Sequence, residues 1–218
     1  NDLLAEWCET IEHYLAESQK KENGGRGAGA DGAGGGTQTS GGGTHDRNDG
    51  PWTELEYWRR RMQRLTNIME QLKTKECKQV LGVLASYTKG GNDQGSVQGH
   101  AVYALLRRWK AIDVSITEAA NEAKDNEKYL KTLEKFIEPL YEDDPMAIID
   151  TLPALMNSIK MIHTIARYYN TTERMTNLFV KITNQMITKC KFTILNFRRI
   201  REGNTGKKGA PTGDDVLW

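Results

Sequence analysis

Cysteine is scarce in this sequence. Its 218 residues include three cysteines, Cys8, Cys77 and Cys190, which are far apart, odd in number and never arranged as a CxxC pair. A secreted disulfide framework needs an even, closely spaced set, and a structural zinc site needs paired ligands. We therefore expect free thiols in a reducing compartment.

Long apolar runs and an excess of charge of either sign are also missing. No stretch approaches the roughly 18–20 apolar residues of a membrane span, and the net charge is only +1. Basic clusters at 59–61, 107–108 and 198–201 each lie on an expected helix beside an apolar stripe. At such positions the aliphatic part of an arginine side chain covers the edge of the apolar stripe, while the guanidinium group stays in water. Without a global positive field, we expect neither nucleic acid nor a membrane as a partner.

No cluster of catalytic or metal-binding residues is found. The run GNTGKK at 203–208 is similar to a phosphate-binding loop, but Lys208 stands where Ser or Thr would hold magnesium, and the first glycine and preceding strand are missing. The histidines lie in four different segments without a second ligand at metal-binding spacing: His13, His45, His100 and His163. The sequence thus predicts no catalytic residue, no cofactor and no metal site.

A long heptad pattern is the main positive feature. Residues recur alternately three and four positions apart, and all but one of them are apolar. A helix with such a stripe buries it only against other helices, and at 1.5 Å per residue this one would be roughly 60 Å long. This stripe, called the seam below, comprises Val102, Leu105, Trp109, Ile112, Ile116, Ala119, Ala123, Asn126, Leu130, Leu133, Ile137 and Leu140.

Five residues in and near the seam invite specific roles. Trp58 and Trp109 are the candidate large anchors for a partner, with filling of the chain's own core as the alternative. Ala119 and Ala123 would permit close approach of a neighbouring helix. Asn126, the one polar seam residue, would fix register or partner at a cost in stability, or else lie at an edge facing water.

Helical spacing extends over most of the chain, and no convincing strand is found. We expect an amphipathic helix over 1–22, a flexible glycine-rich linker over 23–50, a helical bundle over 51–201 and a polar loop over 202–218. The predicted fold is all-α: an elongated helical bundle with coiled-coil-like long helices and glycine-rich disordered loops. The absence of an initiator methionine and the opening inside an amphipathic pattern suggest an internal fragment.

Within the bundle the spacing predicts helices over 51–73, 75–88 and 100–141. A further helix should begin at Pro145 behind an Asp144 N-cap and be kinked or restarted at Pro153. Asn170 and Glu173 predict a capping box for a last helix that runs to about residue 200. The expected inward faces are Met146, Ile149, Leu152, Met156, Ile159 and Ile162 in the first of these two helices, and Met175, Leu178, Ile182, Met186, Cys190 and Phe197 in the second.

Three blocks of sequence carry a family resemblance. They are ELEYWRRRM at 54–62, ITEAANEAKDNEKYLKTLEKFIEPLY at 116–141 and YYNTTERMTNLFVKITNQMITKCK at 168–191. In this order they resemble helices of the N-terminal tail of dynein heavy chains, and their detail is similar to axonemal outer-arm chains of the gamma type. The segments 24–49, 90–99 and 192–213 are longer than the family pattern requires.

The resemblance implies a non-catalytic tail segment of a microtubule motor, located in the cytoplasm and cytoskeleton, in the axoneme of a cilium or flagellum. In the family this tail joins other heavy chains, intermediate chains, light chains and the docking complex, and so anchors the motor to the doublet microtubule. ATP and Mg²⁺ are expected only in the motor domain, which the resemblance places outside this sequence. The alternative is a generic helical scaffold or tether unrelated to motors.

The basic segment 191–201 has two interpretations. Its mixture of cationic and apolar residues would suit a calmodulin-like light chain. A solvated helix end explains the same composition without a partner.

Overall fold

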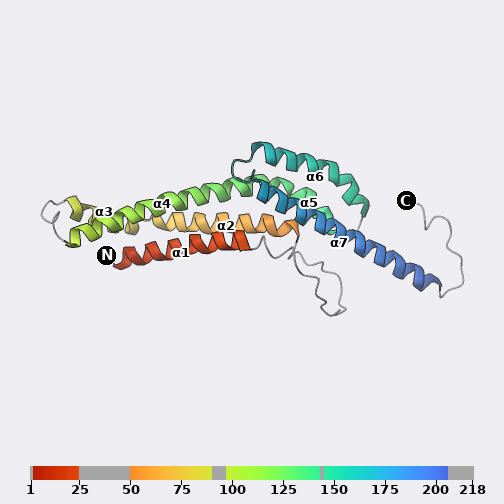
Figure 1. Ribbon diagram of the computed structural model, residues 1–218, viewed down its shortest axis with the longest axis horizontal. Helices are drawn as coiled ribbons and strands as arrows, with labels where there is room; N and C mark the ends of the chain where they lie inside the picture. Colours follow the sequence, from red (N-terminus) through yellow and green to blue (C-terminus); the bar gives the residue numbers. More distant parts are fainter. Residues whose placement is uncertain (1, 25–49, 90–96, 143–144, 206–218) are drawn as a thin grey trace. The chain divides into compact units, whose positions relative to one another are not determined.

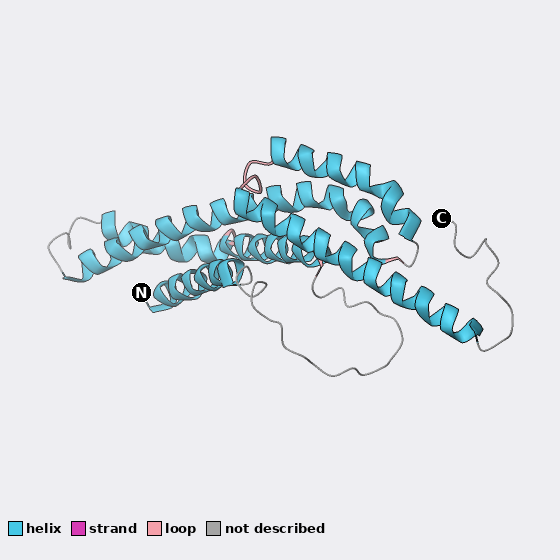
Figure 2. Cartoon of the chain, turned by 45° about the vertical axis from the view of Figure 1, so that its right-hand side comes forward, coloured by secondary structure: helices cyan, strands magenta, loops and turns pink. Residues whose placement is uncertain are grey.

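The computed structural model describes residues 2–24, 50–89, 97–142 and 145–205. In this part of the chain every regular element is a helix and no strand is present (Figure 1 and Figure 2). The all-α prediction is therefore confirmed. The elements are α1 (Asp2–Gly24), α2 (Pro51–Leu72), α3 (Lys75–Lys89), α4 (Val97–Leu130), η1 (Lys131–Leu133), α5 (Glu134–Ile137), η2 (Glu138–Tyr141), α6 (Pro145–Ile165) and α7 (Thr172–Thr205).

Most expected helices occupy their expected ranges, but some ends differ. α4 begins at Val97, inside the expected 90–99 loop, and α7 continues to Thr205, so that residues 202–205 are helical rather than part of a polar loop. A glycine such as Gly203 costs a helix only about 1 kcal/mol relative to alanine, which is too little to end it. The remaining parts of the expected linker and polar loop, 25–49 and 206–218, lie outside the described residues.

The first of two compact units contains α1, α2 from Glu56 onward, α3, and α4 as far as Lys128. In it α1, α2 and α4 lie side by side, with α2 antiparallel to the other two (Figure 1). The Tyr57 hydroxyl donates to the Ser18 carbonyl at 3.5 Å, joining α2 to α1. An ion pair at 3.9 Å between Arg61 and Glu122 joins α2 to α4. The apolar stripes of these helices face one another and form the core of the unit.

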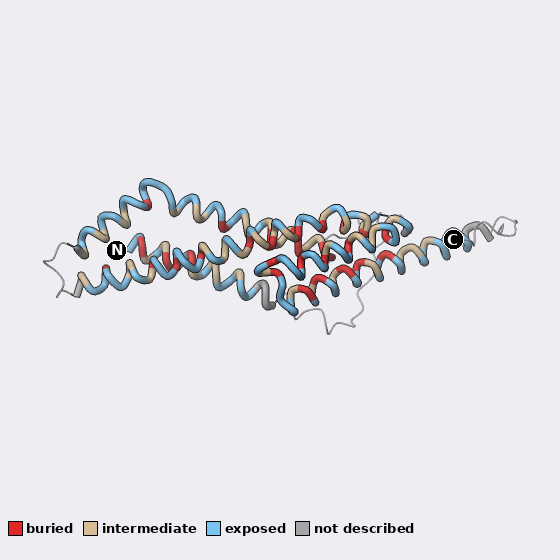
Figure 3. Tube along the Cα trace, turned by 90° about the horizontal axis from the view of Figure 1, so that it is seen from above, coloured by how far each residue is buried: buried red, intermediate tan, exposed pale blue. Residues whose placement is uncertain are grey.

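The second unit contains the first turn of α2, as far as Leu55, and the chain from Tyr129 onward. In it α6 and α7 pack against the irregular helical stretch formed by η1, α5 and η2. Figure 3 shows buried positions recurring along these helices. Its apolar core includes Leu133, Ile137, Leu140, Leu155, Ile159, Ile162, Tyr169, Leu178 and Ile182.

The continuous helix predicted over 100–141 is wrong, because α4 ends at Leu130 and tighter turns follow. The Thr132 hydroxyl donates to the Tyr129 carbonyl at 2.6 Å and competes with a helical N–H for it. Pro139, near the start of η2, has no N–H to donate. The seam nevertheless stays inside: ten of its twelve residues are buried, and Leu105 and Ala119 are half-buried.

α6 buries a different face from the one predicted. Ile149 and Met156, expected inside, are 58% and 36% exposed, whereas Ile148 and Leu155 are buried. The two sets differ by one position and share Ile159 and Ile162, so helical spacing alone does not decide between them. α6 also continues through Pro153 instead of restarting. The proline is exposed, and water can satisfy the Ile149 carbonyl that loses its partner.

The start of α7 differs from the prediction by one residue. The Thr171 hydroxyl accepts a hydrogen bond from the Arg174 backbone N–H at 3.3 Å, so Thr171 rather than Asn170 is the N-cap. The Asp144 cap predicted for α6 lies outside the described residues, although α6 does begin at Pro145.

The inner face of α7 is partly polar. Met175, Leu178 and Ile182 are buried as predicted, but the next positions of this face are Gln185 and Lys189. Met186 is only half-buried, and Cys190 and Phe197, expected inside, are exposed. The spacing of three and four residues thus continues, with polar side chains where apolar ones were expected.

Candidate functional site

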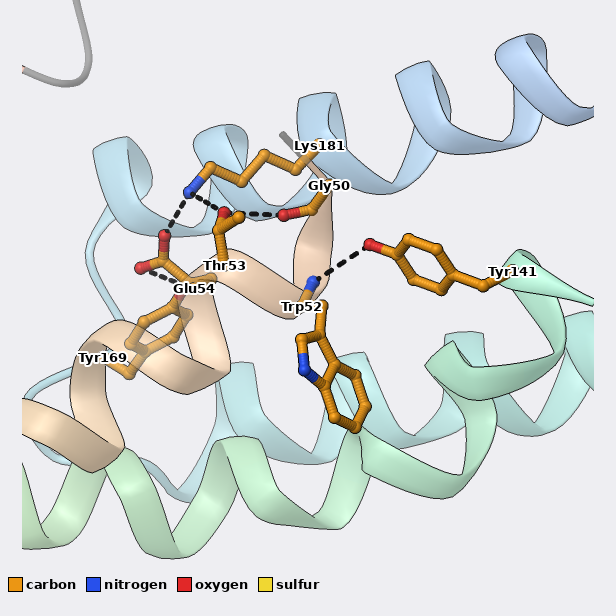
Figure 4. Close-up of polar contacts among 7 residues, drawn as sticks. All are labelled: Gly50, Trp52, Thr53, Glu54, Tyr141, Tyr169 and Lys181. Atoms are coloured by element: carbon orange, nitrogen blue, oxygen red, sulfur yellow. Dashed lines mark hydrogen bonds and ion pairs between the residues drawn. The ribbon is translucent and has the colours of Figure 1, made fainter. Parts of the chain in front are cut away.

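A buried polar network in the second unit joins residues from all three sequence blocks that carry the resemblance (Figure 4). The helix starting at Pro51 contributes one part, η2 another, and the segment from Tyr168 to Lys191 the third. We call this network the polar junction. It comprises Gly50, Trp52, Thr53, Glu54, Tyr141, Tyr169, Lys181, Gln185 and Lys189.

Glu54 is the centre of the junction. Glu54 is only 6% exposed. Its carboxylate accepts hydrogen bonds from Lys181 Nζ at 2.7 Å and from the Tyr169 hydroxyl at 3.1 Å. A buried carboxylate is tolerable only when paired and hydrogen-bonded, and both conditions are met here. Its place in the first turn of α2 adds a favourable interaction with the positive end of the helix dipole.

The start of α2 is held by short contacts around Gly50. The Gly50 carbonyl accepts from the Thr53 hydroxyl at 2.7 Å and from the Thr53 N–H at 3.1 Å. The Trp52 N–H donates to the Tyr141 hydroxyl at 3.3 Å. A Cβ atom on residue 50 would collide with that hydroxyl, so any other residue here would have to displace the Tyr141 side chain and disturb its hydrogen bond to Trp52. Gly50, which we assigned to the flexible linker, is therefore a buried part of the helix start.

The carbonyl end of η2 is capped by α7. Gln185 Nε2 donates to the Leu140 carbonyl at 3.1 Å, and Lys189 Nζ donates to the Tyr141 carbonyl at 3.3 Å. Lys189 is 1% exposed, and its ammonium also lies 5.7 Å from the centroid of the Phe192 ring. A cation at the C-terminal end of a helical stretch is favourable because the last carbonyls there lack helical partners.

Sequence reasoning missed this junction, although one signal was present. Lys181, Gln185 and Lys189 recur every four residues on the buried face of α7, which is unusual for polar side chains unless they have partners. The predicted buried face of this helix contains only apolar side chains and Cys190, and so leaves out these three polar residues.

Both tryptophans proposed as anchors lie inside the first unit. Trp58 is 0% exposed, with Tyr57 edge-on at 5.1 Å and the Arg61 guanidinium 5.8 Å from its ring. Trp109 is 7% exposed and lies 6.2 Å from Trp7. These placements favour the alternative in which both fill the chain's own core. A role in binding another chain stays a prediction.

Asn126 is fully buried, so it does not face water at an edge. Among the described residues neither its Nδ2 nor its Oδ1 has a hydrogen-bond partner, and the same is true of Arg61 Nε. Burying an amide without a partner costs free energy. We therefore expect Asn126 to weaken the packing of this chain, and its proposed role in pairing stays a prediction.

A polar contact of a different kind joins α1 to α4. Arg108 donates to the Glu12 carboxylate at 2.9 and 2.5 Å, and both side chains are more than a third exposed. This hydrogen bonding lowers the pKa of Glu12 and raises that of Arg108. Burial raises the pKa of Cys8 and of Cys77, so both thiols are protonated at neutral pH.

Several apolar side chains remain outside the core of the second unit. On α6 they include Ile149 and Ile165, which are 58% and 51% exposed. On α7 they include Ile194 and Ile200, which are 62% and 60% exposed, within the segment 191–201 considered for a light chain. No residue of α7 after Lys189 is buried among those whose exposure is described.

The described residues contain no group of His, Cys, Asp and Glu that could hold a metal ion. His13, His100 and His163 are exposed on separate helices, and His45 lies outside the described part. None of the described helices is long and apolar enough to cross a membrane. Of the GNTGKK run, residues 203–205 belong to α7 rather than to a loop that follows a strand.

Comparison with known proteins extends the resemblance to almost the whole chain. Residues 1–205 match the family model of the dynein heavy chain, N-terminal region 1. The chain is 42% identical over 199 residues to the dynein gamma chain of the flagellar outer arm of Chlamydomonas reinhardtii, covering 91% of this chain and 4% of the relative. It is 48% identical over 147 residues to rat dynein axonemal heavy chain 5 and 39% identical over 193 residues to human dynein axonemal heavy chain 8. These matches cover 67% and 87% of this chain and 4% of each relative.

Proposed function

Because the chain belongs to the dynein heavy chains, as a piece of their non-ATPase N-terminal tail, we propose that it helps to hold an outer-arm motor together. In this proposal it joins other heavy chains and binds intermediate chains, light chains and the docking complex. Through them it anchors the motor to the doublet microtubule of the axoneme. The match over 91% of the chain excludes a scaffold unrelated to motors.

The polar junction is the observation that carries the proposal. A tail that transmits force needs segments that keep their relative geometry under load. Hydrogen bonds to a buried carboxylate and to helix-end carbonyls satisfy this need, because they are directional and costly to break in a low-dielectric interior. They fix the start of α2, the end of η2 and the middle of α7 to one another within the second unit.

The exposed apolar side chains of α6 support the choice of protein partners. Ile149 and Met156 lie seven residues apart and therefore on the same helical face, and both are exposed. Apolar groups presented on a rigid helix are typical of sites at which another helix packs.

The test uses the full-length heavy chain with Ile149 and Met156 both replaced by aspartate. We expect intermediate chains recovered with the heavy chain to fall by about tenfold, because two charges would enter an apolar contact. The control is Val114→Asp, since Val114 is similarly exposed at 57% but lies on α4 in the first unit. Undiminished recovery with the α6 variant, at unchanged thermal stability of the 218-residue chain, would contradict the proposed surface.

Nucleotide binding is expected to lie elsewhere in the heavy chain. We propose that this segment binds neither ATP nor Mg²⁺, since the run at 203–208 that is similar to a phosphate-binding loop lacks the first glycine, the Ser or Thr for magnesium and the preceding strand. Calorimetry of the chain with Mg-ATP at micromolar concentrations should show no heat of binding, and saturable binding would refute this.

A further inference from the structure

The first unit contains an apolar groove that the polar junction and the proposed α6 surface do not involve. It has a volume of about 560 Å³ and lies between α1, the end of α2 and the start of α3. Its apolar lining includes Trp7, Tyr14, Ile68 and Leu72, together with Leu3, which is 49% exposed.

The charge of the groove is one-sided. Among the described residues that line it are two carboxylates, Glu6 on α1 and Glu76 on α3, and no lysine, arginine or histidine. Both glutamates are exposed. An apolar wall with acidic edges is complementary to a helix that carries apolar and basic residues on one face.

The chain itself presents such a helix at the end of α7. Ile194, Phe197, Arg198 and Arg201 follow at i, i+3, i+4 and i+7, so they share one helical face. All four are exposed. In Figure 3 the last turns of α7 carry no buried segment.

The two surfaces also match in length. The groove follows α1 from Leu3 to Tyr14, which at 1.5 Å per residue is roughly 17 Å. The face from Ile194 to Arg201 needs roughly 11 Å by the same measure. Two apolar side chains of α7 could therefore enter the groove while its two arginines reach the glutamates at the edge.

We propose that the groove between α1, α2 and α3 binds the end of α7 of a second copy of this chain. The contact is heterologous, since it joins two different surfaces, and it therefore leaves a free groove and a free helix end at the two extremities of each assembly. The proposal rests on the association with other heavy chains proposed above and assigns a surface to it. It uses the segment 191–201 that was also considered for a light chain, and it does not involve the α6 surface proposed for intermediate chains.

The test is the mass of the 218-residue chain in solution, measured by light scattering and sedimentation over a range of concentrations at low salt. We expect the average mass to rise with concentration and to fall when salt is added. Replacing Glu6 and Glu76 by lysine, or Arg198 and Arg201 by glutamate, should each weaken association by at least about tenfold. These positions are exposed, so we expect both variants to fold, which circular dichroism would verify.

Mixing the two charge-reversed variants provides the sharpest outcome. The basic groove of one variant would then meet the acidic helix end of the other, and association should return. Two double variants at exposed positions outside the groove and α7 serve as matched controls and should leave the association almost unchanged. Glu70→Lys with Glu118→Lys matches the reversal in the groove, and Lys131→Glu with Lys160→Glu matches the reversal on α7. A chain that stays monomeric, or an association that both reversals leave unchanged, would overturn the proposal. Neither result would affect the recovery of intermediate chains with the full-length heavy chain.

Discussion

The two units of this chain use polar side chains in opposite ways. In the first unit the Arg108–Glu12 pair lies at the surface, and the buried polar side chains Arg61 and Asn126 each have atoms without a hydrogen-bond partner among the described residues. In the second unit Glu54, Gln185 and Lys189 are buried, and each is hydrogen-bonded. The difference predicts that replacing a buried polar side chain such as Asn126 by an apolar one stabilises the first unit, whereas removing one such as Glu54 destabilises the second.

The largest effect is expected from Leu133→Asp in the second unit. Leu133 is 0% exposed, and a carboxylate there would have no partner. An unpaired buried charge costs several kcal/mol, a large share of a typical stability of about 5–15 kcal/mol. We expect loss of helicity or of assembly with other chains, measured by circular dichroism and complex recovery. Lys128→Asp, at an exposed position five residues earlier, should change little. Equal melting temperatures for the two variants would show that the seam is not packed.

Glu54→Ala tests the polar junction directly. It removes the carboxylate that pairs with Lys181 and accepts from Tyr169. The Lys181 ammonium then keeps its hydrogen bond to the Thr53 hydroxyl but loses its counter-charge, and the Tyr169 hydroxyl loses this acceptor. Breaking one side of a buried pair typically costs about 3–5 kcal/mol. Urea unfolding should show this loss. The matched comparison is Glu56→Ala, whose carboxylate contacts the more exposed Arg59 and Arg60 and should cost under about 1 kcal/mol. Similar losses in both variants would remove the contrast between buried and surface pairs.

Asn126→Leu should raise the stability of the chain, whereas the two substitutions above lower it. The buried amide has no hydrogen-bond partner among the described residues, so an apolar side chain of similar size should stabilise the chain by about 1–3 kcal/mol. Thermal unfolding measures this gain, and light scattering measures any new oligomers. A stabilised chain of unchanged mass would assign Asn126 no role in pairing, whereas mixed oligomers would support one. A lower melting temperature would indicate that the amide has a partner, such as an internal water.

The smallest effect is expected at the surface pair of the first unit. Because the pKa of Glu12 is lowered in the folded chain, its contribution is present above the ordinary range of a glutamate and is lost as the pH falls through the lowered value. Glu12→Gln should therefore reduce the melting temperature slightly at neutral pH and not at all in strong acid. A difference that persists undiminished to low pH would mean that Glu12 acts through packing rather than charge.

The sequence predicted the helices well, because the apolar spacing is regular from Leu55 to Leu72 and again from Val102 to Leu140. The prediction of buried residues failed where the spacing was compatible with two different helix faces, or where a polar side chain is buried. Around Pro153 two sets of apolar residues one position apart were equally periodic. At Gln185 and Lys189, burial depends on carbonyls at the end of η2, some 45 residues earlier in the chain, which no local pattern reveals. After Leu130 the Thr132 hydroxyl bonds to the Tyr129 carbonyl and Pro139 lacks an N–H, and the apolar spacing reveals neither effect.

The burial of two of the three cysteines makes the chain selective towards alkylating reagents. Cys8 and Cys77 are enclosed and held in the unreactive protonated form, whereas Cys190 is open to solvent. A maleimide dye or nitroxide added to the native chain should therefore attach at one position without any engineering. That position lies one residue after Lys189, which is the last buried residue of α7 among those whose exposure is described. The probe would report on whatever packs against the last turns of that helix.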